Sequence, residues 1–162
     1  MADHGLSHVG ADGRARMVDV GAKEATERTA VAEGFVRISA ALEEKIRAGA
    51  LAKGPVLEVA RLAGIMAAKR TDGLIPLCHG LALEHVDVSA EVEPGRVRVV
   101  ATVKTTAKTG VEMEALVAVS LACLTVVDMG KAVDKGMVIE GVRLLEKRGG
   151  RSGDYSAGGV GP

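Results

Sequence analysis

The sequence predicts an α+β domain of the ferredoxin-like kind, a βαββαβ sandwich in which helices cover one face of an antiparallel sheet. Three observations support this class: an amphipathic helix precedes a hairpin, a long apolar helix follows it, and strands stand before the first helix and after the second. Such an order is typical of the ferredoxin-like arrangement. The length of 162 residues suits one domain with a sizeable core.

Short strands and one capped helix are predicted at the start of the domain. We expect strands over residues 16–20 and 33–38, separated by the polar segment AKEATERTA. Ser39 is a favourable N-cap for the helix ALEEKIRAG, and Gly49 is suited to ending it in a left-handed conformation.

A second helix is predicted over residues 56–70, because apolar side chains recur there at helical spacing. The expected buried stripe consists of Val56, Val59, Ala60, Ala63, Met66 and Ala67. Lys69 and its neighbour close this helix, and TDG turns the chain. We interpret LIPLCHG, residues 74–80, as a structured loop because Pro76 interrupts it.

A hairpin is the next predicted unit. Apolar and polar residues alternate over residues 85–92 and 96–104, and the Glu-Pro-Gly sequence at 93–95 joins these two half-buried strands. A last strand is expected over residues 137–145, interrupted by Gly141.

The long apolar helix, expected over residues 110–136, organises the rest of the chain. Residues 115–127 contain only Ser120 and Thr125 as polar residues. This run is too short for a bilayer, which needs roughly 20 apolar residues. A helix that is apolar on nearly all sides is therefore expected to be buried by protein, from two directions.

Charged residues mark the two ends of this helix. Asp128 and Lys131 are three positions apart on one face, and Lys135 is expected one turn further along that side. Glu114 points to a similar side, but at about 1.5 Å per residue it lies roughly 21 Å from Asp128 along the axis. One compact site in one subunit can hardly use both ends, so this spacing favours a homo-oligomer.

Composition excludes several classes of protein. The 21 basic residues are balanced by 21 acidic ones, and Phe35 and Tyr155 are the only aromatic residues, so a nucleic-acid-binding surface is not expected. Cys78 and Cys123 have no spacing typical of a disulfide framework or a zinc site. We expect a soluble cytoplasmic protein that uses no metal and spans no membrane.

The residues alone leave the roles of the charged groups open. Asp128 and Lys131 form either a surface ion pair, typically contributing under ~1 kcal/mol, or a carboxylate and a lysine that exchanges protons with a ligand. Four roles are open for His79. It could be hydrogen-bonded within its loop, act as a general base, donate a hydrogen bond to a phosphate or, least favourably, bind a metal. Glu112 and Glu114 are either solvated acids or recognise an amine or guanine.

Several cations near glycines or helix ends are either solvated charges or ligands of a polyphosphate. These are Lys53, Lys69, Arg70, Lys147, Arg148 and Arg151. No phosphate-binding loop of the GxxxxGK[ST] type and no GxGxxG after a strand is present, so a standard nucleotide fold is not supported.

Five segments in order resemble the cyclic pyranopterin monophosphate synthases of molybdenum cofactor biosynthesis. They are ARLAGIMAAKRT, LIPLCHGL, KTGVEMEAL, DMGKAVDKGMVI and VRLLEKRGGRSGD. The resemblance implies a homohexamer built as a trimer of dimers, with active sites at the dimer interface. It implies a substrate derived from GTP, cyclic 3′,8-bridged dihydro-GTP, and the products cyclic pyranopterin monophosphate and pyrophosphate, without a redox cofactor.

The same resemblance assigns roles by position. Asp128 matches the catalytic aspartate and Lys131 its lysine partner. Residues that match substrate-binding positions are Leu77, Cys78, His79, Met113, Glu114, Glu112, Lys53, Lys69 and Lys147. The GGRSGD segment resembles a mobile tail that covers bound phosphates. We expect a flexible arm over residues 1–16, one catalytic domain over 17–147 and a flexible tail over 148–162.

Three departures from the family pattern are Pro55, Gly80 and Gly130, where KGD, CHP and DMCKA are usual. They leave open a non-catalytic oligomeric paralogue that binds a pterin or nucleotide. A purely structural oligomer is the third possibility.

Overall fold

The computed structural model describes residues 13–151 and 153–158 of the chain. In that part of the chain the elements are, in order, β1 (Thr26–Arg37), α1 (Ala40–Arg47), α2 (Val56–Ala68), α3 (Thr71–Leu74), β2 (His85–Glu93), β3 (Arg96–Ala107), α4 (Glu112–Gly130), β4 (Val138–Arg148) and β5 (Tyr155–Ser156). The expected βαββαβ order is therefore present, with a short fifth strand added.

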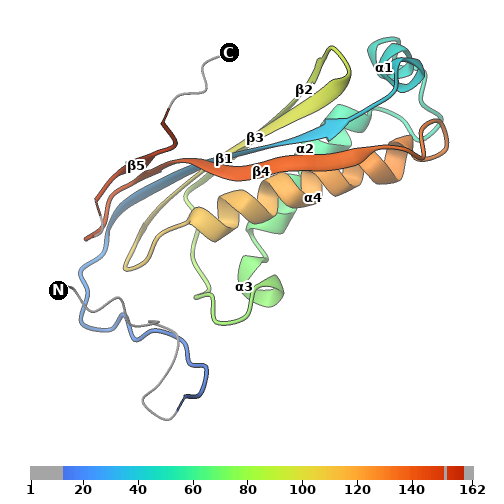
Figure 1. Cartoon of the computed structure of the whole chain (residues 1–162). Helices are drawn as coiled ribbons and strands as arrows, with labels where there is room; N and C mark the ends of the chain where they lie inside the picture. The colour runs from blue at the N-terminus through green and yellow to red at the C-terminus, as the bar shows by residue number, and fades with distance from the viewer. Residues whose placement is uncertain (1–12, 152, 159–162) are drawn as a thin grey trace.

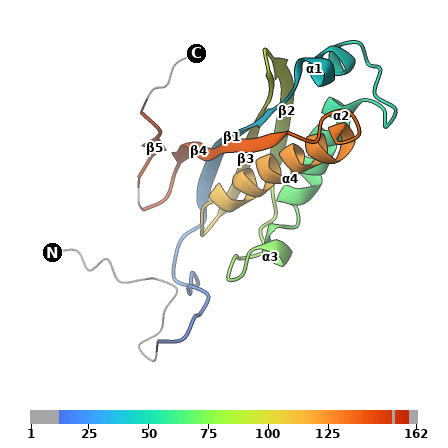
Figure 2. The same ribbon diagram turned by 45° about the vertical axis from the view of Figure 1, so that its right-hand side comes forward.

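The sheet has the strand order β2-β3-β1-β4-β5, and every neighbouring pair is antiparallel. The helices α2 and α4 cover one face of this sheet, and α1 lies at one end of it (Figure 1, Figure 2). The ferredoxin-like α+β class is confirmed.

Small residues set the spacing between the layers. A Cβ atom at Gly34 of β1 would lie 2.7 Å from Val119 Cγ1 of α4, and one at Gly64 of α2 would lie 2.9 Å from the Ala118 carbonyl oxygen. Neither position has room for a larger side chain. Because the helices and the sheet approach closely at these glycines, side chains of Val, Ala and Leu can fill the core without aromatic rings.

The strand predicted over residues 16–20 is wrong, because this segment is irregular and β1 begins at Thr26 within the segment taken as a polar spacer. Arg28, a charged residue of that spacer, is buried within the strand and donates from Nε to the Ala107 carbonyl oxygen at 3.4 Å. Glu33 accepts hydrogen bonds from Arg98 of β3 at 2.9 Å and from Arg143 of β4 at 2.7 Å. A polar strand is thus stabilised by pairs with both neighbours.

The buried stripe of α2 differs from the prediction. Val56, Ala60 and Ala67 are buried as expected, but Val59 and Met66 are exposed. Gly64 is buried instead, since its missing side chain lets α2 approach α4. The helix also ends at Ala68 rather than at residue 70.

The long helix α4 ends at Gly130, six residues before the predicted end at Gly136. Lys131 is the C-cap residue, so Lys135 lies beyond the helix in the following turn and does not continue its face. By length and composition α4 could cross a membrane, but 56% of its most apolar 18-residue stretch is buried inside the protein. Packing against the sheet and α2 accounts for its apolar character.

The end of the chain contains a strand that the sequence did not predict. Tyr155 pairs with Lys147 of β4, and Ser156 pairs with Glu146. Gly141, predicted to interrupt the last strand, has a φ of 63° beside a register shift between β1 and β4. It therefore forms a bulge within a continuous β4.

Candidate functional site

An aspartate and two lysines meet at the C-terminal end of α4. Lys131 Nζ donates to Asp128 Oδ1 at 2.6 Å, and Lys53 Nζ donates to Asp128 Oδ2 at 2.9 Å. Lys53 also donates to the Asp128 carbonyl oxygen at 2.8 Å. Both oxygens of one carboxylate are therefore occupied by ammonium groups from two different segments.

The two lysines keep Asp128 ionised. The hydrogen bond from Lys131, followed by that from Lys53, lowers the pKa of Asp128 to about 2. The side chains of Asp128 and Lys131 are nevertheless 57% and 61% exposed. This cluster is an open, charged surface, accessible to a ligand or to a second protein chain.

Backbone contacts hold the segment that carries Lys131. Lys131 N donates to the Val127 carbonyl oxygen at 3.0 Å, which continues the last turn of α4. Asp134 then accepts hydrogen bonds from Ser39 N at 2.7 Å and from Gly136 N at 2.8 Å. The turn after α4 is thus tied to the start of α1.

A cavity of about 330 Å³ lies at the other end of α4. It brings together six predicted binding residues: Leu77, Cys78, His79, Glu112, Met113 and Glu114. Val18 and Val20 also line it, so the segment misread as a strand contributes to its wall. An apolar wall with a few convergent polar groups is typical of a small-molecule site.

Glu114 is the buried acid of this cavity, only 4% exposed. Burial raises the pKa of Glu114, and repulsion from Glu112 and Asp72 adds to the effect. Burial also raises the pKa of the Cys78 thiol. Because a thiol rather than a thiolate is favoured, Cys78 is placed to contact a ligand and not to attack one.

The loop that carries Leu77 and His79 has an unusual backbone. Leu77 has a φ of 66°, and it is the one non-glycine residue with positive φ in the described part of the chain. Such strained conformations persist where surrounding structure fixes them and are frequent at ligand-binding loops. The same described residues contain no group of three or more potential metal-ligating side chains.

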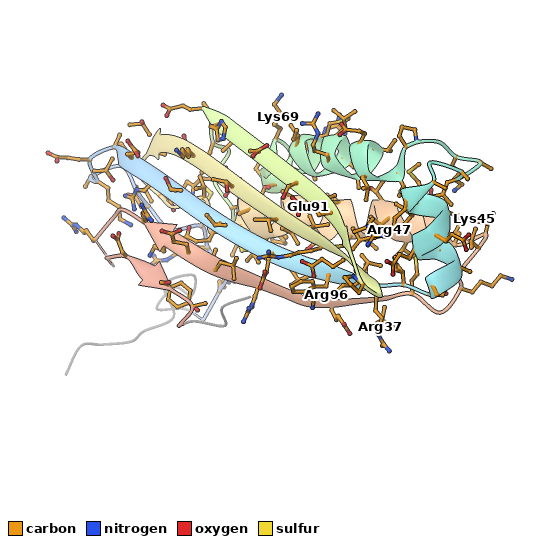
Figure 3. The ribbon with its side chains drawn as sticks, turned by 90° about the horizontal axis from the view of Figure 1, so that it is seen from above. Arg37, Lys45, Arg47, Lys69, Glu91 and Arg96 are labelled. Carbon is orange, nitrogen blue, oxygen red and sulfur yellow. The ribbon has the colours of Figure 1, made fainter. Side chains whose placement is uncertain are left out.

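The remaining predicted residues divide between the two ends. Lys53 belongs with Asp128, whereas Lys147 Nζ lies 3.6 Å from Glu112 Oε1 beside the cavity. Lys69 follows α2 as an exposed residue, and Figure 3 shows it and Lys45 at opposite ends of the helical layer. Contacts among the described residues join Lys69 to neither cluster.

Sequence reasoning missed several residues near the Glu112 end. Lys23, Arg28 and Lys108 line a second cavity there, next to the first. The concentration of cations and threonines in AKEATERTA and KTTAKTG was the available signal. It was not recognised because the two segments are about 80 positions apart and meet only in the folded sheet, where residues 26–29 of β1 pair with residues 104–107 of β3.

The fold and these two clusters define a ferredoxin-like α+β protein with a small-molecule site. Residues 17–150 match the model of the MoaC family. The chain is 60% identical to a Corynebacterium efficiens protein over 151 residues, or 93% of this chain and 97% of that one. It is 55% identical to a Novosphingobium aromaticivorans protein over 94% of this chain and 97% of that one. Both relatives are named cyclic pyranopterin monophosphate synthase. The chain belongs to the MoaC family.

Proposed function

We propose that the chain converts cyclic 3′,8-bridged dihydro-GTP to cyclic pyranopterin monophosphate with release of pyrophosphate, in the cytoplasmic biosynthesis of molybdenum cofactor. The reaction is that of a phosphorus–oxygen lyase and needs no redox cofactor. The observation that carries the proposal is the carboxylate of Asp128 held between Lys53 and Lys131. The names of two relatives, at 60% and 55% identity, support cyclic pyranopterin monophosphate as the product.

Lys131 is the proposed general acid and base. A carboxylate that stays ionised down to about pH 2 holds the side chain of Lys131 in place through a hydrogen bond of 2.6 Å. When the sugar hydroxyl attacks the α-phosphate, a new oxygen–phosphorus bond forms as the bond to the pyrophosphate oxygen breaks. The hydroxyl proton passes to Lys131 in its amine form, and the resulting ammonium group, together with Lys53, offsets the negative charge on phosphate.

The cavity at the other end of α4 is the proposed site for the purine-derived ring. Its wall offers the ring polar groups from His79, Glu112 and the buried Glu114. Leu77, Cys78 and Met113 provide apolar contact. Removing water from this cavity strengthens each polar interaction that the ring makes.

A complete active site requires a second copy of the chain. Glu114 and Asp128 are separated by about 21 Å along one helix, which exceeds the reach of the compact ring system. Leu62 and Met66 of α2 and Leu124 of α4 are exposed apolar residues that a partner subunit would cover. We propose a homohexamer, a trimer of dimers, in which Asp128 of one subunit approaches the cavity of another.

The test is turnover of the bridged GTP substrate by a Lys131→Ala variant, followed as pyrophosphate release. We expect a loss of about 10²–10⁴-fold in kcat. Lys135→Ala is the matched control, because it removes one exposed cation from the turn that follows. Near-normal release by Lys131→Ala would refute the assignment.

Mixing subunits tests the shared site. Glu114→Ala and Lys131→Ala proteins, assayed at substrate concentrations well below KM where we expect each alone to be impaired, should regain activity when they exchange subunits, because some interfaces then combine two intact halves. Failure to regain activity after demonstrated subunit exchange would place both residues in sites within one subunit.

A further inference from the structure

The turn between α4 and β4, residues 131–137, is fastened to the start of α1 by one carboxylate. Asp134 Oδ2 accepts a hydrogen bond from Ser39 N at 2.7 Å, across 95 positions of the chain. Its other oxygen accepts from Gly136 N at 2.8 Å, and Asp134 N donates to the Gly130 carbonyl oxygen at 3.1 Å. Both views of the ribbon place α1 at this end of α4 (Figure 1, Figure 2). Backbone groups thus occupy both oxygens of the Asp134 side chain.

The contact with Ser39 is more than a local turn motif. An aspartate commonly accepts a hydrogen bond from the backbone N–H two residues further on, and the contact with Gly136 is of this kind. The contact with Ser39 reaches a different element. The hydrogen bond from Ser39 N, followed by that from Gly136 N, lowers the pKa of Asp134, so the acceptor is an ionised carboxylate. Such charge-assisted hydrogen bonds are roughly twice as strong as neutral ones.

The helix α1 is itself fixed to the rest of the domain. Ile38 N donates to the Gly95 carbonyl oxygen at 2.9 Å, and Glu43 accepts from Gly95 N at 2.8 Å, so the tip of the β2–β3 hairpin holds the start of α1. Leu42 is fully buried, and a Cβ atom at Gly130 would lie 2.8 Å from its Cδ2. The helix therefore packs directly against the last residue of α4 and gives the following turn a firm point of attachment.

The two lysines of the Asp128 cluster lie on the segments that this attachment connects. Lys131 begins the turn, three residues before Asp134, and Lys53 lies in the connection from α1 to α2. They donate to different oxygens of Asp128, at 2.6 Å and 2.9 Å. Lysine side chains are long and flexible. Whether both ammonium groups reach one carboxylate at the same time therefore depends on how firmly their backbones are held relative to each other.

We propose that Asp134 is a positioning residue for the reaction. Through Ser39 it fixes the turn that carries Lys131 to α1, and so keeps Lys131 and Lys53 on the two oxygens of Asp128. This inference rests on the proposed function for the reaction in which Lys131 acts. It predicts an effect on kcat rather than on KM, because the cavity proposed for the ring lies at the other end of α4.

The backbone at Ser39 allows the donor alone to be tested. Ser39 has a φ of −74° and a ψ of 157°, a conformation that proline adopts. Ser39→Pro removes the N–H and the hydroxyl, whereas Ser39→Ala removes only the hydroxyl, which caps α1 at Leu42 N and makes a lesser contact with Asp134. Comparing the two variants therefore isolates the N–H. We expect kcat of Ser39→Pro to be about threefold below that of Ser39→Ala, with KM within about twofold.

Removing the acceptor completes the cycle. Asp134→Ala should lower kcat about tenfold, again with KM within about twofold. In the Asp134→Ala background, Ser39→Pro and Ser39→Ala should have equal kcat, because the N–H has already lost its acceptor. Val88→Ala, at a buried position of β2 packed against α2, is the control for general loss of stability. It should unfold at lower urea concentration and keep kcat within about twofold.

The position of Lys131 can also be measured without turnover. Brief acetylation followed by mass spectrometry gives the labelling rate of Lys131 relative to Lys104, an exposed residue of β3. This ratio should rise about threefold in Asp134→Ala, because a hydrogen bond to Asp128 that opens more often leaves the amine accessible for longer.

Each outcome supports or overturns the role of Asp134. Normal kcat in Asp134→Ala, a rise in KM alone, or unchanged labelling of Lys131 would overturn it. So would a difference between Ser39→Pro and Ser39→Ala that persists in the Asp134→Ala background. If Ser39→Pro does not fold, as judged by circular dichroism, Asp134→Ala and the labelling decide. If the unmodified protein does not convert the bridged substrate, the proposed function fails, and the labelling of Lys131 still decides whether Asp134 positions it.

Discussion

The two ends of α4 carry acids in opposite electrostatic states. Asp128, in the last turn, is exposed and its pKa is lowered to about 2 by two lysines. Glu114, in the first turn, is buried and its pKa is raised. The helix dipole predicts the reverse, because it stabilises negative charge at the N-terminus and opposes it at the C-terminus.

Local contacts therefore outweigh the dipole at both ends. At Asp128 two ammonium groups lie within 2.9 Å of the carboxylate oxygens. At Glu114 removal from water dominates, and nearby Glu112 and Asp72 add repulsion. One end is suited to holding charge and handling protons, and the other to enclosing a neutral ring.

The largest expected effect is that of Asp128→Asn. The amide carries no charge to hold Lys53 and Lys131, so we expect kcat to fall about 10²–10⁴-fold while the fold persists. Pyrophosphate release under substrate saturation measures the loss. Asp87→Asn, at an exposed position of β2, is the matched control. If the Asp128→Asn enzyme keeps more than a tenth of the normal kcat, the Asp128 end of α4 does not carry the chemistry, and the proposed difference from the Glu114 end is refuted.

The next effect concerns Glu114→Gln, which keeps the shape and removes the charge. We expect KM for the bridged substrate to rise about tenfold with a smaller change in kcat, because ring recognition is lost rather than proton transfer. Steady-state kinetics of both variants separates the two roles. A selective loss of kcat in Glu114→Gln would contradict this division.

The Glu114→Gln variant should also differ from the unmodified protein in how its stability depends on pH. Since the pKa of Glu114 is raised in the folded state, the folded protein binds more protons than the unfolded one just above the ordinary pKa of 4.5. The contribution of Glu114 to the free energy of unfolding therefore decreases as pH rises through that window. Denaturant titrations should show this decrease in the unmodified protein and not in Glu114→Gln; parallel curves would contradict it.

Particular residues show what the sequence could predict. The hairpin, α1 with its Ser39 cap and the class of the fold follow from local patterns, and the structure confirms them. The start of β1 could not be predicted, since Arg28 in its polar first half is buried through a contact with the Ala107 carbonyl oxygen, 79 positions away in the chain. Helical spacing places Asp128 beside Lys131, but Lys53, in the connection from α1 to α2, reaches them only because α2 packs against α4. The pairing of Arg28 with the turn at Gly150 is likewise a tertiary contact.

A smaller effect on activity is expected from Asp134→Asn. Its carboxylate accepts a hydrogen bond from Ser39 N, which ties the turn after Lys131 to the start of α1, and one from Gly136 N within the turn. Both contacts lower the pKa of Asp134. We expect kcat to fall about three- to fivefold, because Lys131 is held less firmly. A lowered pKa stabilises the fold above the ordinary pKa of 3.8, and this stabilisation is lost as pH falls through the folded-state value. Urea titrations of both proteins should therefore differ at pH 7 and converge in acid; a constant difference would refute the carboxylate's role.

The smallest effect is expected from Gly130→Ala, at the end of α4 next to the aspartate–lysine cluster. A Cβ atom there would lie 2.8 Å from Leu42 Cδ2 and 3.2 Å from the end of the Met137 side chain. Both contacts involve side-chain ends that can shift, and alanine favours the helix by up to about 1 kcal/mol. Overpacking typically costs 1–3 kcal/mol, so we expect a net loss of roughly 1 kcal/mol in the free energy of unfolding. Because α1 rather than the cluster absorbs the strain, kcat should stay within about twofold of normal. A large loss of kcat without loss of stability would show that Gly130 serves Lys131 directly, and the departure from the usual DMCKA sequence would then be functional rather than a matter of packing.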